Sequence, residues 1–139
     1  MAVVRSPHEA IRTGVAMAKK HSVKFLAVVE AARAEIPECD AGELRSMLAD
    51  GQPIVVLDVR ERHEYEAGHL VGSVHIGKGV LERDIEKHEF EENTRMVLYC
   101  GGGFRSAIAA KSLKEMGYSK AFSLWGGWRG IQAEGLPIE

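Results

Sequence analysis

The segment Met96-Val97-Leu98-Tyr99-Cys100-Gly101-Gly102-Gly103-Phe104-Arg105-Ser106 decides the fold of this 139-residue chain. Its apolar start, residues 96–99, predicts a buried strand, and residues 105–116 predict the helix that follows. The three glycines between them predict a loop whose backbone N–H groups can turn toward one point. Cys100 therefore lies where a strand ends, beside a helix N-terminus, and a helix N-terminus favours negative charge. We expect an ionised, reachable sulfur at position 100, ringed by inward-pointing amides.

Strands and helices alternate along the rest of the chain from about residue 35. The predicted strands cover residues 35–38, 54–59, 73–76, 96–99 and 121–124. The predicted helices cover residues 41–49, 61–67, 80–90 and 105–116, with a last short helix that ends near residue 133. The β-branched run at 54–59 shows no polar alternation, so we expect both of its faces to be buried. The pattern predicts an α/β fold with a parallel five-stranded sheet and helices on both faces.

The first 34 residues carry helix signals and almost no strand or turn signals. Ser6, Pro7 and Glu9 have the form of a helix start with a capping box, and they predict a helix to about residue 20. Ser22 caps a second predicted helix to about residue 34, whose apolar residues share one face: Phe25, Val28, Val29 and Ala32. We interpret residues 1–34 as an N-terminal helical extension. It either packs on the main domain, residues 35–139, or mediates self-association as a homodimer.

Composition is that of an ordinary globular protein of one domain. Hydrophobic residues make up 45%, charged residues 27%, and the formal net charge is −2. We therefore expect no nucleic acid and no anionic membrane as partner. No apolar stretch reaches the roughly 20 residues of a membrane helix, and the N-terminus lacks the features of a signal peptide. The two cysteines, Cys39 and Cys100, are too few for a disulfide framework and favour a cytoplasmic location.

Three residues are expected to meet at one edge of the sheet. Ligands of parallel α/β sheets bind outside the carboxyl ends of the strands. Cys100 follows one predicted strand, and Asp58 and Arg60 lie at the same end of another. Arg105 is the expected cation beside the sulfur. Arg60 is a weaker candidate for that role, because a structural salt bridge to Asp58 or Glu66 explains it slightly better.

Three motifs occur along the chain in a specific order. The first is Leu57-Asp58-Val59-Arg60, followed downstream by Gly68-His69-Leu70-Val71-Gly72-Ser73. The second is the loop Cys100-Gly101-Gly102-Gly103-Phe104-Arg105-Ser106, and the third is Leu124-Trp125-Gly126-Gly127-Trp128. Together they resemble the motifs of the rhodanese-like domain family. The resemblance runs from about residue 35 to residue 137, implies the three-layer rhodanese-like fold, and assigns His69 a structural hydrogen-bonding role.

The resemblance implies a thiosulfate sulfurtransferase. Cys100 would be the catalytic nucleophile, which takes a sulfane sulfur from a small anionic donor, holds it as a persulfide and passes it to a thiol, cyanide or protein acceptor. Asp58 and Arg60 would support the loop. No organic cofactor is implied, and the six histidines show no metal-ligand spacing, so no metal is expected. The expected substrate-binding residues are Gly101, Gly102, Gly103, Phe104, Arg105 and Ser106.

Alternatives to this function stay open from the sequence. Four residues lie between Cys100 and Arg105, as in the sulfur-transferring branch of the family, whereas its phosphatase relatives carry five. A small thiolate-dependent phosphatase or arsenate reductase is one alternative, and a non-catalytic sulfur-carrier or redox-sensing module is another. Phe104 departs from the more polar residues frequent at its position, and we expect it to narrow the mouth or to contact an apolar or protein acceptor. Cys39 is interpreted as a packed residue, against the alternative of a resolving thiol for Cys100.

Overall fold

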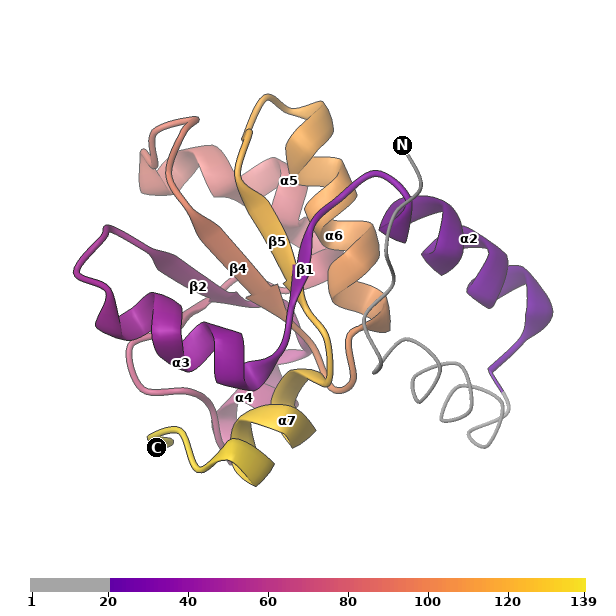
Figure 1. The fold of residues 1–139 in the computed structure, drawn as a ribbon. Coiled ribbons are helices and arrows are strands. Elements are labelled where there is room, and N and C mark those ends of the chain that lie inside the picture. The colour runs from indigo at the N-terminus through magenta and orange to yellow at the C-terminus, as the bar shows by residue number, and fades with distance from the viewer. Residues whose placement is uncertain (1–20) are drawn as a thin grey trace.

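A parallel sheet forms the centre of the molecule. The computed structural model describes residues 21–139, so the predicted helix at residues 7–20 lies outside the described part. The five strands run parallel in the order β1-β5-β4-β2-β3 (Figure 1). They are β1 (Glu38–Cys39), β2 (Val55–Asp58), β3 (Val74–His75), β4 (Met96–Tyr99) and β5 (Ala121–Leu124). The predicted α/β fold is therefore confirmed, and the strand at 121–124 has the predicted bounds.

Helices cover both faces of this sheet. The helices in the described part of the chain are α2 (Val23–Arg33), α3 (Ala41–Ala49), α4 (Arg62–Ala67), α5 (Leu81–Asp84), α6 (Phe104–Glu115) and α7 (Gly127–Glu134). One apolar core joins the sheet to α5 and α6, and a second joins its other face to α3 and α7. Val56 belongs to the second core and its neighbour Leu57 to the first, because successive strand residues point to opposite faces. This burial on both sides explains the uninterrupted apolar run in β2.

Local capping sets the start of two helices where the sequence predicted it. Asp40 caps α3: its side chain accepts the Glu43 N–H at 2.9 Å, and the Asp40 N–H donates to the Glu43 carboxylate at 3.0 Å. Ser22 caps α2 by accepting the Phe25 N–H at 3.2 Å. Side-chain oxygens thus satisfy N–H groups that have no partner within the helix.

Residues 80–90 do not form the single amphipathic helix that their periodicity predicts. The segment consists of the 3-10 turn η1 (Lys78–Val80), the short α5 and a second 3-10 turn, η2 (Ile85–His88). Its buried residues, Leu81 and Ile85, are one helical turn apart. The segment therefore packs on the sheet through one turn of helix, and the longer helix predicted over residues 80–90 is not needed. Tertiary packing here outweighs periodicity. The first strand likewise lies at Glu38–Cys39 rather than across residues 35–38.

Helix α2 packs on the side of α6 that faces away from the sheet (Figure 1). Val29 and Ala32 are buried there, in a third apolar cluster with Phe104 and Ala107. Val28 departs from the predicted apolar face, since 53% of it is exposed. The helix thus packs on the main domain, which was one of the two interpretations, and self-association stays a prediction. Within residues 21–139, no helix has both the length and the apolar character needed to cross a membrane.

Candidate active site

The Cys100 sulfur receives hydrogen bonds from the loop that follows it. Cys100 comes directly after β4, and α6 begins at Phe104. The Gly103 N–H donates to Sγ at 3.1 Å and the Ser106 N–H at 3.4 Å. The Ser106 hydroxyl also lies 3.4 Å from Sγ, and it is 2.8 Å from the Ser123 hydroxyl. Backbone donors converging on one sulfur, at the N-terminus of a twelve-residue helix, form an arrangement that can stabilise a thiolate.

Cys100 is less exposed than the sequence analysis expected. Only 1% of the residue is accessible, so the expectation of a reachable side chain is not met in this conformation. The expected inward-pointing amides are present at Gly103 and Ser106. The sulfur therefore lies below the surface, in the apolar core on the α5 and α6 face of the sheet, with its backbone donors already aimed at it.

Two glycines allow the loop to fit against the start of α7. Gly103 has a φ of +108°, and a Cβ atom there would lie 2.9 Å from the Trp125 ring. A Cβ atom on Gly127 would lie 2.4 Å from the Cys100 carbonyl oxygen, which is closer than any side chain can approach. In return the Trp128 N–H donates to that carbonyl at 2.7 Å. The Gly126-Gly127 motif thus keeps α7 in backbone contact with the cysteine loop.

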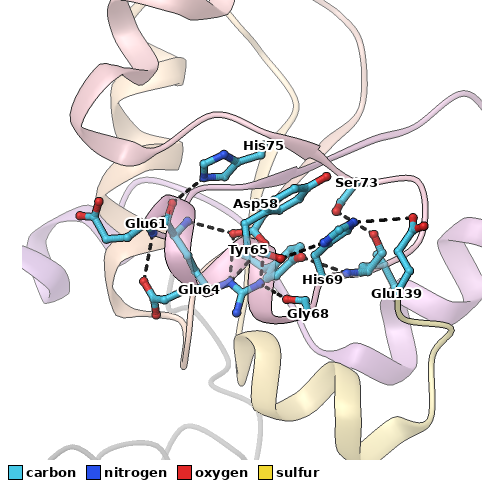
Figure 2. A network of polar contacts seen from close by, with 12 residues as sticks. Asp58, Glu61, Glu64, Tyr65, Gly68, His69, Ser73, His75 and Glu139 are labelled. Atoms are coloured by element: carbon cyan, nitrogen blue, oxygen red, sulfur yellow. Dashed lines mark hydrogen bonds and ion pairs between the residues drawn. The ribbon is translucent and has the colours of Figure 1, made fainter.

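Asp58 and Arg60 form a buried ion pair at the neighbouring strand end. β2 and β4 are adjacent, and Asp58 is in register with Tyr99, so Asp58 and Cys100 do lie at one edge of the sheet as predicted. The Arg60 guanidinium contacts the Asp58 carboxylate at 2.7 Å and donates to the Gly68 carbonyl, also at 2.7 Å (Figure 2). Both residues are nearly inaccessible. The predicted salt bridge to Asp58 is confirmed, and the Arg60 guanidinium faces its structural partners.

Aromatic rings pack beside this ion pair, and a stack of rings connects it to Tyr65 of α4. The Arg60 guanidinium lies 4.7 Å from the centroid of the Trp128 ring. Tyr65 stacks on His69 at 3.7 Å and on His75 at 4.7 Å, and the His75 ring contacts the Arg60 carbonyl (Figure 2). His69 bonds the Tyr65 carbonyl through Nδ1 at 2.9 Å. These contacts give His69 the structural place that the resemblance implied.

Arg105, the predicted cation, lies beside the loop and is paired with a carboxylate that the sequence analysis did not single out. Its guanidinium contacts Glu64 of α4 at 2.9 and 3.2 Å. The hydrogen bond from Arg105 is the main cause that lowers the pKa of Glu64 to about 2. The pKa of Arg105 is raised, chiefly by that hydrogen bond and also by attraction to Cys100. Glu64 also helps to cap α4, and this local role was the signal in the sequence that could have drawn attention to it.

Phe104 is buried under α2. Only 7% of it is exposed, and its ring lies 4.8 Å from His21, 6.4 Å from Phe25 and 6.0 Å from Trp125, between ring centroids. The side chain of this loop residue therefore joins α2 to the first turn of α6. A helix outside the three motifs contacts the candidate site in this way.

Cys39 is placed as a packed residue. It belongs to the core on the α3 and α7 face, and burial is the main cause that raises the pKa of its thiol to about 12. Strand β5 lies between β1, which carries Cys39, and β4, which leads to Cys100. Two strand spacings amount to roughly 9–10 Å, beyond the roughly 7 Å that a disulfide spans between Cα atoms. A direct link between the two cysteines would need the backbone to move.

Within the described residues, no group of three or more histidine, cysteine, aspartate or glutamate side chains could hold a metal ion.

Residues 40–134, which contain most of the sheet and the cysteine loop, match a family model described as the rhodanese-like domain. The chain belongs to the rhodanese-like domain family. Solved structures of this family agree with the fold: the rhodanese-like domain of an Anabaena protein has a TM-score of 0.68 and 31% identity, over 74% of this chain and 78% of that one.

Relatives of this rhodanese-like chain carry different descriptions. A Bacillus subtilis protein described as a putative sulfur carrier, YrkF, is 34% identical over 68% of this chain and 50% of its own length. A tRNA uridine(34) hydroxylase of Escherichia coli is 29% identical over 70% of this chain and 30% of its own length. A Rhodopseudomonas palustris structure, described as a possible tyrosine phosphatase of unknown function, has a TM-score of 0.72 and 27% identity, over 86% of this chain and 96% of that one. The chain spans half or less of the length of the two curated relatives.

Proposed function

We propose that this rhodanese-like chain is a sulfurtransferase that carries a sulfane sulfur on Cys100. The observation that supports it best is the convergence of the Gly103 and Ser106 N–H groups on Sγ. These donors stabilise negative charge on Sγ, which is the attacking atom in the first step and the leaving atom in the second. Arg105 lies beside the loop in an ion pair with Glu64, and Asp58 with Arg60 holds the neighbouring strand end.

The proposed reaction has two steps. The Cys100 thiolate attacks the outer sulfur of thiosulfate, a new S–S bond forms, and sulfite leaves with the electron pair of the broken S–S bond. A nucleophile such as cyanide or a thiolate then attacks the outer sulfur of the persulfide. The sulfur leaves with that acceptor, and the Cys100 thiolate is regenerated. No oxidant or cofactor enters either step, and a ping-pong rate law is expected.

Mass spectrometry and turnover together test this function. Thiosulfate should add the mass of one sulfur atom to the wild-type chain, and Cys100→Ser should remove both the adduct and the formation of thiocyanate from cyanide. Cys39→Ser is the matched control and should keep both, because Cys39 lies in a separate core. A Cys100→Ser variant with wild-type turnover would overturn the proposal.

Both cysteines are free thiols, as a reducing, cytoplasmic location would require.

The same experiments separate this function from two others. A sulfur carrier, the description given to the Bacillus relative, would form the adduct but turn over neither cyanide nor thiols. A phosphatase, the description given to the Rhodopseudomonas structure, would hydrolyse para-nitrophenyl phosphate. The four-residue spacing from Cys100 to Arg105 supports sulfur transfer over phosphate hydrolysis.

A further inference from the structure

Two arginines, one from α6 and one from α7, lie against the cysteine loop. Nη2 of Arg105 lies 3.3 Å from the point that a Cβ atom on Gly101 would occupy. Nη2 of Arg129 lies 2.7 Å from the corresponding point on Gly102. The second distance is shorter than a real Cβ contact, so the Arg129 guanidinium occupies the space that a side chain at position 102 would fill.

The two guanidinium groups differ in their ion-pair partners. Glu64 holds Arg105 through two hydrogen bonds and neutralises its charge. Arg129 is exposed, and within residues 21–139 no aspartate or glutamate forms an ion pair with it. Arg129 is therefore the arginine at this loop whose donors are available to an incoming anion.

The backbone fixes the position of Arg129 relative to Cys100. Arg129 lies in the first turn of α7, where the Trp128 N–H donates to the Cys100 carbonyl at 2.7 Å. The Arg129 N–H approaches the Gly101 carbonyl at 3.4 Å. Main-chain hydrogen bonds hold α7 against the loop, so the backbone of Arg129 is fixed and only its side chain can change position.

We propose that Arg129 binds the anionic group of the sulfur donor beside the Cys100 loop. A planar guanidinium can donate two parallel hydrogen bonds to the oxygens of a sulfonate, a sulfite or a carboxylate. In the first step of the proposed reaction it would hold the sulfonate oxygens of thiosulfate while the outer sulfur is attacked, and then the departing sulfite. The inference rests on the proposed function. It names a specificity-determining residue that none of the three sequence motifs singled out.

Alkylation with two reagents that differ in charge tests Arg129 without requiring turnover. Iodoacetate and iodoacetamide both transfer a two-carbon group to the Cys100 thiolate and release iodide, but only iodoacetate is an anion. The measured quantity is the ratio of their rate constants at Cys100, read by peptide mass spectrometry. Removing one positive charge beside the loop, with Arg129→Gln, should lower the iodoacetate-to-iodoacetamide ratio about fivefold. Arg129→Lys should restore part of the ratio, because lysine keeps the charge without the planar fork.

Lys120→Gln is the matched charge control. Lys120 is exposed and precedes β5, at the opposite end of the sheet from the Cys100 loop, so its loss should leave the ratio unchanged. In parallel, Arg129→Gln should raise the KM for thiosulfate several-fold.

The outcomes distinguish this inference from the proposed function. If both reagents modify Cys100 and the ratio is the same in wild type and Arg129→Gln, Arg129 is not the anion-binding residue and the sulfurtransferase proposal stands. An equal fall of the ratio in Lys120→Gln would overturn the inference too, since net charge alone would then explain it. If neither reagent nor thiosulfate modifies Cys100 in the wild-type chain, both proposals fail together.

Discussion

Glu64 and Arg105 form a two-point ion pair beside the cysteine loop, with Nη1–Oε1 and Nη2–Oε2 distances of 2.9 and 3.2 Å. The two residues are 41 positions apart in the sequence, and α4 brings Glu64 to the first turn of α6. The pair places a carboxylate next to a site that is proposed to accept anions. Its charge therefore opposes the approach of thiosulfate.

Glu64→Gln should improve the use of anionic donors. The substitution removes the negative charge and leaves part of the hydrogen-bonding capacity of the Arg105 guanidinium unused, so we expect the KM for thiosulfate to fall about threefold. Steady-state kinetics with cyanide as acceptor measure it. Glu66→Gln is the matched control on the same helix, since the Glu66 side chain is 62% exposed and pairs with Arg62. An unchanged KM in Glu64→Gln, or an equal fall in Glu66→Gln, would contradict the prediction.

Acid should destabilise the wild type more than Glu64→Gln. The hydrogen bond from Arg105 lowers the pKa of Glu64 from its ordinary value near 4.5 to about 2. Because folding depresses this pKa, the stabilisation is fully present above about pH 4.5 and is lost as the pH falls toward 2. For a partly exposed pair, we expect a stability difference of about 1 kcal/mol between wild type and variant at pH 6. Urea unfolding at pH 6 and pH 3 should show that difference shrinking, and a constant difference would count against it.

Local signals in the sequence were enough to predict most of the fold. The apolar runs at β2, β4 and β5 and the capping box of α3 act through neighbours in the sequence, and these elements lie where they were expected. The prediction of one helix over residues 80–90 was wrong, because the conformation of this segment depends on how Leu81 and Ile85 pack on the sheet. Periodicity reports which residues share a face, but it does not report how long the helix must be.

The sequence motifs predicted which residues of the candidate site lie near one another, but not the side chains that surround them. Cys100, the loop glycines and the Asp58–Arg60 pair lie within single motifs, so sequence spacing could identify them. Glu64 and Arg129 reach the loop only through the packing of α4 and α7. Nothing in the local sequence of either arginine shows that Arg105 is paired with a carboxylate and that Arg129 is not.

Ser106→Ala should slow the chemistry at Cys100. The Cys100 thiol donates to the Ser106 hydroxyl at 3.4 Å, and in the thiolate that reacts the hydroxyl becomes the donor. A hydrogen bond to a charged group contributes enough that its loss should reduce iodoacetamide alkylation about tenfold. Ser123→Ala is the comparison, because the Ser123 hydroxyl contacts the Ser106 hydroxyl at 2.8 Å but does not hydrogen-bond the sulfur itself. We expect a smaller effect there. Equal rates in wild type and Ser106→Ala would show that the backbone donors suffice.

Two adjacent valines test the docking of α2. Val29 is fully buried against the cluster that contains Phe104, whereas 53% of Val28 is exposed. The same change, valine to alanine, should lower the free energy of unfolding by about 2 kcal/mol at position 29. At position 28 the change should stay within about 0.5 kcal/mol. Urea unfolding followed by tryptophan fluorescence measures both, and equal effects would mean that α2 does not pack on α6 in solution.

Gly127→Ala should disturb the cysteine loop from the neighbouring helix. A Cβ atom at this position would lie 2.4 Å from the Cys100 carbonyl oxygen and 2.8 Å from the Gly101 carbonyl carbon, and both are backbone atoms that cannot rotate away. The loop or α7 must therefore shift, which weakens the hydrogen bond from Trp128 to Cys100 and moves the amides aimed at the sulfur.

We expect Gly127→Ala to lose about 3 kcal/mol of stability and to alkylate at Cys100 at least tenfold more slowly. Gly79→Ala makes the same chemical change where no atom lies within 4 Å of the new methyl group, and it should keep the wild-type stability and alkylation rate. Urea unfolding and iodoacetamide kinetics on both variants decide the matter. Wild-type behaviour of Gly127→Ala would mean that the close contact between α7 and the loop is not needed to shape the site. If Gly127→Ala does not fold while Gly79→Ala does, the contact is needed for the fold as a whole.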